Sequence, residues 1–586
     1  MPTIDMCILV IAADGSEPDL ASIRQNLDYL GTPYTLHMAT QNPGGLIPDV
    51  LSSGDHAFYH GIILTTGDLV YLRGSDWISA LSPHEWRTLR DFEARFDIRQ
   101  LTWYTYPTAD YGFRLPATGV DTTSGPIWAR FTPSGQSLFS YVNTTHDLPI
   151  QGVNAYLAPP LLDNGVVPLL QESTGNALAV VRTDADGCQN LALTFDSSPF
   201  AMHSLVLAYG LISWVTKGLF VGERHTYLSP QIDDMLIDDR ERRADLPCDS
   251  PGSASDLTYR MCGADLITAA SWQESKRVRQ ASADLRLTFA FNGCGAVPNG
   301  FEGDTLIPEV IRLQDNFYWV SHTYDHTDMD TMDYTQARAE IQQNLVAAER
   351  LGLSRFSSLS LVTPAVSGLN NSAVLQAAHD GGVRYLVSDT SRPGEGSPSP
   401  NTGIISPHQP SLIVIPRHPT NLYYDVTTPE EWVAEYNCQY ASHWGRNLTF
   451  DEILDRESQE ILRYLVQGGM EPIMFHQANL RIYERGRSLL SDLLDMALFK
   501  YAHLLNVPIL CPTMDELGQR MAARMQYNNA AITATLVPGQ HVALSAQYPA
   551  TVPITGLVSG CAESYGGQLI SYIRLEACQS VTLPLQ

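Results

Sequence analysis

The sequence predicts a multidomain α/β protein, and three observations support this fold class. The chain has 586 residues, which is more than one hydrophobic core normally supports. Strand-like and helix-like segments alternate along most of its length, as they do in layered α/β folds. Hydrophobic residues make up 44% of the chain and aromatic residues 9%, a composition typical of folded rather than disordered proteins.

Residues 1–220 form the first predicted domain, which has an α/β pattern. Five apolar runs in it are expected to be strands: 4–13, 34–39, 61–66, 176–183 and 190–196. An amphipathic helix is expected at 17–31, where it ends at a glycine, and a strongly apolar helix at 203–220. Between about 104 and 160 the helix pattern disappears, and short strands rich in aromatic residues and threonine replace it. We interpret this stretch as a β insertion with the character of a β-sandwich module.

Residues 221–525 form the second predicted domain, in which β-then-α units repeat. Its main expected strands are 287–293, 318–323, 357–364, 384–389, 411–417 and 472–477. Its main expected helices are 334–352, 372–383, 451–469 and 488–505. Such repeats predict a parallel sheet or an incomplete barrel, whose ligands bind beyond the carboxyl ends of the strands. Residues 526–586 lack a helix pattern and are expected to form a C-terminal β region.

The charge of the chain excludes some partners. Its formal net charge is -27 at pH 7, and the only lysines are Lys217, Lys276 and Lys500. Nucleic acid is not expected as a partner, because binding it requires a basic surface. No apolar run reaches the roughly 18 residues that a membrane span needs, so no membrane span is expected either.

The nine cysteines include no CxxC pair of the kind that builds thiolate zinc sites. We expect two disulfides instead, Cys248 with Cys262 and Cys561 with Cys578. Together with three glycosylation sequons, they favour a secreted or cell-wall-associated protein; the sequons begin at Asn143, Asn370 and Asn447. No signal peptide precedes the first strand, as expected of a mature or trimmed form.

The segment SPQIDDMLIDDR, at residues 229–240, contains two pairs of adjacent carboxylates. The pair Asp233–Asp234 follows a short run that leads out of a predicted strand. The pair Asp238–Asp239 begins the charged stretch DDRERRAD, so we interpret it as a solvated rim or the start of a loop.

Three histidines lie near other strand ends of the same domain. His322 and His326 are four residues apart, so one helical turn would place both imidazoles on the same side. The strand at 472–477 delivers His476. Two histidines and one carboxylate with an open position are typical of catalytic zinc. Each feature alone is common by chance, but their coincidence predicts that Asp234, His322 and His326 bind Zn²⁺ or another divalent metal.

This order of motifs resembles the NodB-homology polysaccharide deacetylases. QIDD matches the acidic pair of that family, residues 322–326 match its His-Ser/Thr-x-x-His motif, and Met474-Phe475-His476 matches its closing Leu-x-His motif. The run TFAFNG, at 288–293, resembles the strand between the first two motifs. The resemblance implies a NodB-like incomplete (β/α) barrel, with Asp233 as the catalytic base and His476 as the acid that protonates the leaving amine.

Two motifs of the family are altered in this chain. The arginine of the third motif is missing from LVTPAVSGLN, at 361–370. Arg417 is a candidate for its orienting role, and Asp389 is a candidate for the carboxylate of the fourth motif. With the N-terminal α/β domain and the β modules, the pattern looks most like the galactosaminogalactan deacetylases of carbohydrate esterase family 18.

The first domain is similar to class I glutamine-amidotransferase-like domains. It lacks their Gly-x-Cys-x-Gly turn, because Cys188 lies in DGCQN and Cys7 lies inside the first strand, so we expect a non-catalytic domain. Four aromatic residues of the β insertion either present a surface for sugar rings or form a small core: Trp128, Phe131, Phe139 and Tyr141.

The function expected from the resemblance is metal-dependent N-deacetylation of an extracellular N-acetylhexosamine polysaccharide, with release of acetate. N-acetylgalactosamine units of galactosaminogalactan are the favoured substrate. Two alternatives stay open: a chitin or peptidoglycan deacetylase, and a catalytically inactive carbohydrate-binding protein of the cell wall. The motifs act on the acetamide rather than on the sugar, so they do not separate the possible polymers.

Overall fold

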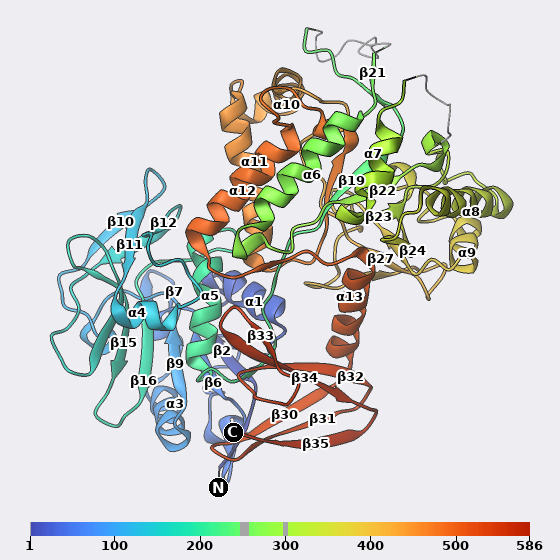
Figure 1. Ribbon diagram of the computed structural model, residues 1–586. Coiled ribbons are helices and arrows are strands. Elements are labelled where there is room, and N and C mark those ends of the chain that lie inside the picture. Colours follow the sequence, from blue (N-terminus) through green and yellow to red (C-terminus); the bar gives the residue numbers. More distant parts are fainter. Residues whose placement is uncertain (1, 246–256, 297–302, 586) are drawn as a thin grey trace. The chain divides into compact units, whose positions relative to one another are not determined.

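The computed structural model of the protein describes residues 2–245, 257–296 and 303–585 (Figure 1). This described chain forms two compact units. The first unit comprises residues 1–225, 502–507 and 526–586. The second unit comprises residues 226–501 and 508–525. The predicted α/β multidomain class is confirmed, whereas the predicted domain limits at residues 220 and 525 stay predictions.

In the described part of the first unit, nine strands form one sheet: β2 (Ile8–Ala12), β3 (Tyr34–Met38), β6 (Gly61–Leu64), β9 (Arg99–Thr102), β11 (Ile127–Phe131), β12 (Leu148–Ile150), β14 (Val166–Gln171), β15 (Ala177–Thr183) and β16 (Gln189–Leu193). Their order is β12-β11-β14-β15-β16-β9-β6-β2-β3. The strands from β3 to β16 are parallel, and those from β16 to β12 are antiparallel. The five strands predicted for this segment are all present in the sheet.

The helices of the first unit include α1 (Pro18–Leu30), α3 (Pro83–Phe96) and α5 (Met202–Val215). Helix α1 ends at Gly31, whose left-handed conformation terminates the helix as the sequence predicts. Helix α3 was missed by the sequence analysis. It begins with a capping box between Ser82 and Glu85, and it buries Leu89 and Phe92.

The predicted β insertion contributes its strands β11 and β12 to the edge of this sheet. Two further strands, β10 (Thr118–Asp121) and β13 (Asn154–Leu157), pair with each other. Phe131, Phe139 and Tyr141 are buried and pack edge to face in sequence, so these three rings form core. Trp128 is 55% exposed. Of the four aromatic residues, it alone can present its ring to a ligand.

Strands of the C-terminal segment pair with strands near the start and near the end of residues 1–225. Strand β30 (Ile532–Val537) pairs with β1 (Thr3–Asp5), and β32 (Ala550–Thr555) pairs with β17 (Phe220–Val221). The remaining members of these sheets include β31 (His541–Ala546), β33 (Glu563–Tyr565), β34 (Gln568–Leu575) and β35 (Gln579–Pro584).

The two disulfides expected from the sequence are wrong where the structure describes them. Cys561 and Cys578 are both free and exposed, because Cys561 precedes β33 whereas Cys578 lies in the turn that follows β34. Cys262 is also free, and Cys248 lies outside the described residues. Among the described cysteines, Cys438 is disulfide-bonded.

In the part of the second unit that the structure describes, eight strands form one sheet: β19 (Pro230–Met235), β22 (Thr288–Phe291), β23 (Tyr318–Ser321), β24 (Phe356–Leu361), β25 (Tyr385–Val387), β26 (Ile404–Ile405), β27 (Ile413–Ile415) and β28 (Ile473–His476). Their order is β26-β27-β25-β24-β23-β22-β19-β28. All neighbouring pairs are parallel except β26 with β27.

The sheet of the second unit curls until its two ends meet. Just beyond β27, His418 forms a parallel bridge with Ile473 of β28. The His418 N–H donates to the carbonyl of Pro472 at 2.8 Å, and the Met474 N–H donates to the carbonyl of His418 at 2.8 Å. One bridge therefore closes the ring of parallel strands. This is the incomplete barrel that the sequence predicts, and it brings the carboxyl ends of β27, β28 and β19 side by side.

Helices connect the strands of this barrel. The predicted ones correspond to α8 (Tyr334–Leu351), α9 (Ser372–Asp380), α11 (Phe450–Gln467) and α12 (Leu489–Leu504). Asp333 and Thr449 start α8 and α11 with capping boxes, which satisfy backbone N–H groups that have no partner inside the helix.

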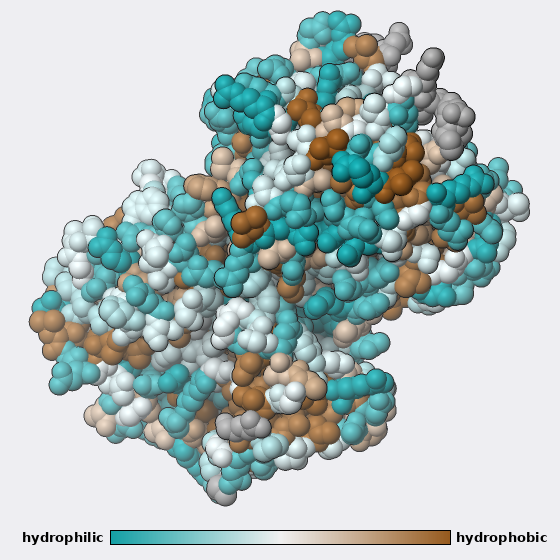
Figure 2. Space-filling view, in the orientation of Figure 1, coloured by the Kyte–Doolittle hydropathy of each residue, from teal (hydrophilic) through white to brown (hydrophobic). Residues whose placement is uncertain are grey.

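The outer surface has no single dominant apolar region on the face shown in Figure 2, where hydrophobic side chains form scattered patches among hydrophilic ones. Scattered apolar side chains are ordinary on protein surfaces, so this face does not by itself mark a binding site. Among the described helices, none is both long and apolar enough to cross a membrane.

Candidate active site

Asp233 and Asp234 lie at the carboxyl end of β19, where the strand is irregular. The pairing of β19 with β22 shifts register between Ile232 and Met235. Asp234 adopts a φ of 64° and Leu236 a φ of 85°, both in the left-handed region that non-glycine residues rarely occupy. A bulge of this kind re-aims the side chains of a strand. The two adjacent carboxylates consequently make different contacts.

His322 and His326 lie in a loop after β23 rather than on a helix, so the expected helical turn is wrong. Thr323 and His326 adopt left-handed φ values of 65° and 57°, and these residues bend the chain. The two imidazole rings meet edge to face with 4.8 Å between their centroids. Backbone strain of this type is concentrated at functional sites.

Two side chains that the sequence analysis missed hold this loop in place. The Asn292 side-chain amide donates to the carbonyls of His322 at 2.6 Å and Thr323 at 3.2 Å. The Glu340 carboxylate accepts hydrogen bonds from the N–H groups of Tyr324 at 2.9 Å and Asp325 at 2.8 Å. Asn292 lies near the end of the run TFAFNG, and its place at a strand end was a usable signal. Glu340 lies on helix α8, and nothing in the sequence around it indicated this role.

Asp234, His322 and His326 form a compact group in which the ligand atoms all lie within 4.8 Å of one another. Asp234 Oδ1 lies 3.2 Å from His322 Nε2 and 3.0 Å from His326 Nε2. His322 Nδ1 donates to the carbonyl of Val362 at 2.9 Å, which directs Nε2 toward the carboxylate. Two imidazole nitrogens and a carboxylate oxygen that converge in this way fit a divalent metal ion.

The same group is electrostatically coupled. Burial acts to raise the pKa of Asp234, but the hydrogen bonds with His322 and His326 outweigh it and hold that pKa well below its ordinary value. Burial acts to lower the pKa of His322, but the contact with Asp234 and the charge of Asp233 raise it overall. Asp234 therefore stays ionised at neutral pH, as a metal-binding carboxylate must.

Asp233 faces a different set of partners. The parallel register of β19 with β28 places Asp233 opposite His476. Asp233 Oδ1 forms a buried ion pair with Arg417 Nη1 at 2.8 Å. His476 Nε2 lies 4.0 Å from Asp234 Oδ2, and its Nδ1 has no hydrogen-bond partner among the described residues. Burial lowers the pKa of His476, although the Asp234 and Asp233 carboxylates oppose this effect.

The structure thus brings together six residues that the sequence singled out: Asp233, Asp234, His322, His326, Arg417 and His476. The Asp389 side chain makes local contacts instead. It accepts hydrogen bonds from the Ser391 N–H at 2.9 Å and the Ser391 hydroxyl at 2.7 Å, and it lies 3.8 Å from Arg392 Nε. Its link to the group is through the backbone, since Thr390 N–H donates to the carbonyl of Arg417 at 3.0 Å.

Asp239 corrects our interpretation of the second acidic pair. Asp238 is not buried, but Asp239 is only 6% exposed and accepts a hydrogen bond from the buried Gln477 side chain at 2.8 Å. Burial and the nearby Asp234 carboxylate raise the pKa of Asp239 well above its ordinary value. The charged stretch that begins here in the sequence suggested solvent, whereas pairing of Asp239 with Tyr259 turns this residue inward.

Comparisons with known proteins agree with this architecture. Residues 309–535 match the family model of the Agd3 deacetylase domain, and residues 4–165 match that of the Agd3 CBM87. The chain is similar to a crystal structure of Agd3, described as a novel carbohydrate deacetylase, with a TM-score of 0.88 and 21% identity over 100% of this chain and 99% of that one. No curated protein shows a significant sequence match.

Two structures of family 4 carbohydrate esterases are similar over a shorter stretch. The enzyme from Streptomyces lividans is 12% identical over 50% of this chain and 94% of its own, with a TM-score of 0.24. The Xyl-CE4 domain of a xylanase from the hindgut metagenome of Trinervitermes trinervoides is 12% identical over 51% of this chain and 92% of its own, with a TM-score of 0.25. Scores this low add nothing to the fold assignment.

The match to a deacetylase domain identifies a polysaccharide deacetylase, a carbohydrate esterase that removes N-acetyl groups from carbohydrate, and the expected resemblance to such enzymes is confirmed. More particularly, two segments of the chain match the two Agd3 modules, the deacetylase domain and the carbohydrate-binding module CBM87. The deacetylase match includes His322, His326 and His476 but begins after Asp233 and Asp234. The roles of these two aspartates rest on the QIDD motif and on their contacts with Arg417, His322 and His326.

Proposed function

We propose that this deacetylase acts on the N-acetylgalactosamine units of an extracellular polysaccharide of the galactosaminogalactan type. One observation carries the deacetylation chemistry: Asp234, His322 and His326 converge at strand ends of the barrel, with Asp233 and His476 beside them. The choice of polymer rests on the resemblance to the galactosaminogalactan deacetylases. Hydrolysis of an acetamide requires a polarised carbonyl, a base for the attacking water and an acid for the leaving amine. The site has a candidate for each of these three requirements: a metal-binding group, the Asp233 carboxylate and the His476 imidazole.

Asp234, His322 and His326 would hold the metal ion, with Zn²⁺ favoured by the two imidazoles and the single carboxylate. Three protein ligands are the number found in catalytic zinc sites, which keep a further position open. When bound, the metal would supply Lewis-acid polarisation of the acetamide carbonyl.

Asp233 would accept a proton from the attacking water, and Arg417 would fix the orientation of its carboxylate through their 2.8 Å ion pair. His476 would donate a proton to the nitrogen as the C–N bond breaks, releasing acetate and an amino sugar. Burial lowers the pKa of His476, but the charges of Asp234 and Asp233 oppose this effect and favour the protonated ring that the donation needs.

The geometry favours an enzyme over an inactive carbohydrate-binding protein. The arginine missing from the third motif was the main argument for inactivity, and Arg417 supplies a guanidinium to Asp233 from another strand end. We also propose a secreted or cell-wall location. Two of the sequon asparagines, Asn370 and Asn447, are exposed and so accessible to glycosylation.

Acetate release from three polymers tests the substrate: an N-acetylgalactosamine-rich polysaccharide, chitin oligomers and peptidoglycan. We expect kcat/KM on the first to exceed the others by at least about 10-fold, equivalent to about 1.4 kcal/mol of transition-state binding. Faster release from chitin or peptidoglycan would replace the proposed polymer and leave the deacetylase assignment intact.

A further inference from the structure

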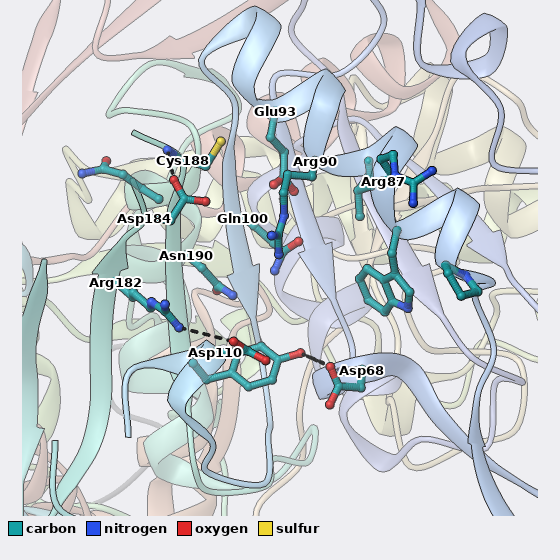
Figure 3. A pocket seen from close by; sticks show the side chains of 15 residues that line it. Asp68, Arg87, Arg90, Glu93, Gln100, Asp110, Arg182, Asp184, Cys188 and Asn190 are labelled. Carbon is teal, nitrogen blue, oxygen red and sulfur yellow. Dashed lines mark hydrogen bonds and ion pairs between the residues drawn. The ribbon is translucent and has the colours of Figure 1, made fainter. Parts of the chain in front are cut away.

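A cavity of about 660 Å³ lies in the first unit, between helix α3 and the strands β9, β15 and β16 (Figure 3). Arg87, Arg90 and Glu93 come from the helix, and Gln100, Arg182 and Asn190 come from the strands that face it. All of its lining residues belong to the first unit, so the cavity is separate from the candidate active site. Its volume is within the range of small-ligand sites.

The walls of this cavity have the chemistry that contacts a sugar ring. Trp86 is partly exposed, and its indole N–H donates to the Ser79 hydroxyl at 3.0 Å, which fixes the ring. Three planar amides, Gln100, Gln189 and Asn190, also line the cavity. The C–H face of a pyranose packs against an indole, while planar amides donate to and accept from its hydroxyls.

The charges around the cavity are balanced, since three arginines face three ionised aspartates, and several of these side chains have partners within the protein. Arg182 forms an ion pair with Asp110 at 3.8 Å, and the Tyr111 hydroxyl donates to Asp68 at 3.0 Å. Asp184 accepts a hydrogen bond from the N–H of Cys188 at 2.9 Å. Because no sign of charge dominates, the cavity favours an uncharged polar ligand over an anion or a cation.

Glu93 adds a direct indication of a ligand. Its side chain is buried, and its Oε1 has no hydrogen-bond partner among the described residues. Burial raises its pKa to about 8, so the carboxyl is protonated at neutral pH and can both donate and accept. A buried polar atom without a partner is costly, and a hydroxyl or amide of a ligand would remove that cost.

We propose that this cavity is a glycan-binding site that takes an N-acetylated hexosamine unit of the polysaccharide, with Trp86 against the sugar ring and Glu93 bonded to its polar groups. The match of residues 4–165 to a carbohydrate-binding module gives the class of ligand but no site within it. The identity of the polymer rests on the proposed function. The cavity would retain acetylated stretches of the chain that have not yet been processed.

The test measures binding without turnover. The full-length chain with Asp233→Asn is titrated with N-acetylgalactosamine-rich polysaccharide and with the same polymer after chemical deacetylation. Trp86→Ala or Arg87→Ala is then added, and Tyr548→Ala, an exposed aromatic outside the cavity lining, is the matched control. We expect Trp86→Ala to weaken binding to the acetylated polymer at least about 10-fold and Tyr548→Ala to change it less than about 2-fold.

Thermal unfolding of each variant separates lost binding from lost folding. If Trp86→Ala unfolds, Arg87→Ala decides, because Arg87 is exposed on α3, and a loss of at least about 3-fold is expected. The proposed site is overturned if Trp86→Ala and Arg87→Ala both bind the polymer as tightly as the parent protein does. It is also overturned if Trp128→Ala loses binding and these two variants do not. Tighter binding of the deacetylated polymer overturns the ligand class. If binding depends on Trp86 but the protein with Asp233 intact releases no acetate from the same polymer, only the proposed function is contradicted.

Discussion

Arg417 Nη1 lies 2.8 Å from Asp233 Oδ1, and the two side chains are only 1% and 5% exposed. Arg417 follows strand β27, whereas the resemblance to NodB-homology deacetylases leads one to expect an arginine in the segment 361–370. The carboxyl ends of parallel barrel strands lie at the same end of the barrel. A guanidinium after β27 or in the segment 361–370 can therefore reach the same carboxylate. The structure thus locates a candidate replacement for the missing arginine.

Arg417→Lys should lower kcat by at least about 10-fold while the protein stays folded. Lysine keeps the charge but lacks the planar fork that fixes a carboxylate. Arg417→Met should also destabilise the fold by about 3–5 kcal/mol, because it leaves the buried Asp233 carboxylate uncompensated. Initial rates and urea unfolding check both. Arg446→Lys, at an exposed ion pair with Glu452, is the control; an equal effect there would remove the positioning role.

Metal content separates the proposed base, Asp233, from the proposed metal ligand His326. Asp233→Asn should retain stoichiometric metal and lose turnover by at least about 100-fold, because the base is removed while the ligands stay. His326→Ala should lose both metal and turnover. Metal analysis after gel filtration, with His379→Ala as a half-buried histidine control, measures this. Full activity of Asp233→Asn would show that another group is the base.

His476→Gln should reduce kcat by about 100-fold or more without releasing the metal, because general acid catalysis contributes about 10²–10⁴-fold. Its Nε2 lies 4.0 Å from Asp234 Oδ2, beside the proposed ligands but outside their group. Rates on substrates with better leaving groups give a second readout. The loss of kcat in His476→Gln should become smaller as the leaving amine becomes less basic. A loss of kcat that stays the same for all of these substrates would point to a structural role for His476.

The first unit contains a pH-dependent contact outside the candidate site. His225 lies 3.3 Å from Glu223 and 3.2 Å from Glu563. Burial acts to lower the pKa of His225, but these two glutamates raise it overall. A raised folded-state pKa contributes stability that is complete below the unfolded value of about 6.5 and is lost as pH rises through the folded value.

Unfolding free energy should therefore fall as the pH rises from about 6 to above the folded pKa of His225. Glu563→Gln should flatten this dependence. Denaturant unfolding of both proteins across that range measures the difference. Identical pH profiles would mean that the His225 contacts do not couple protonation to folding.

Part of this structure was predictable from the sequence and part was not. Strong periodicity predicted most of the barrel strands and several of the helices that connect them, and strand ends predicted which side chains would meet, including His476 opposite Asp233. Local left-handed turns at Asp234 and His326 were not predictable, because their strain is sustained by tertiary contacts such as those of Asn292. The burial of Asp239 was missed for a similar reason, since its partner Gln477 lies far along the chain.

The most direct test of the account measures acetate release from N-acetylgalactosamine-rich polysaccharide before and after removal of metal by a chelator. If Asp234, His322 and His326 bind the metal that polarises the acetamide, the chelated protein should lose activity and Zn²⁺ should restore it. The His326→Ala variant should show no restoration. Acetate release that continues at full rate in the metal-free protein would contradict the central claim.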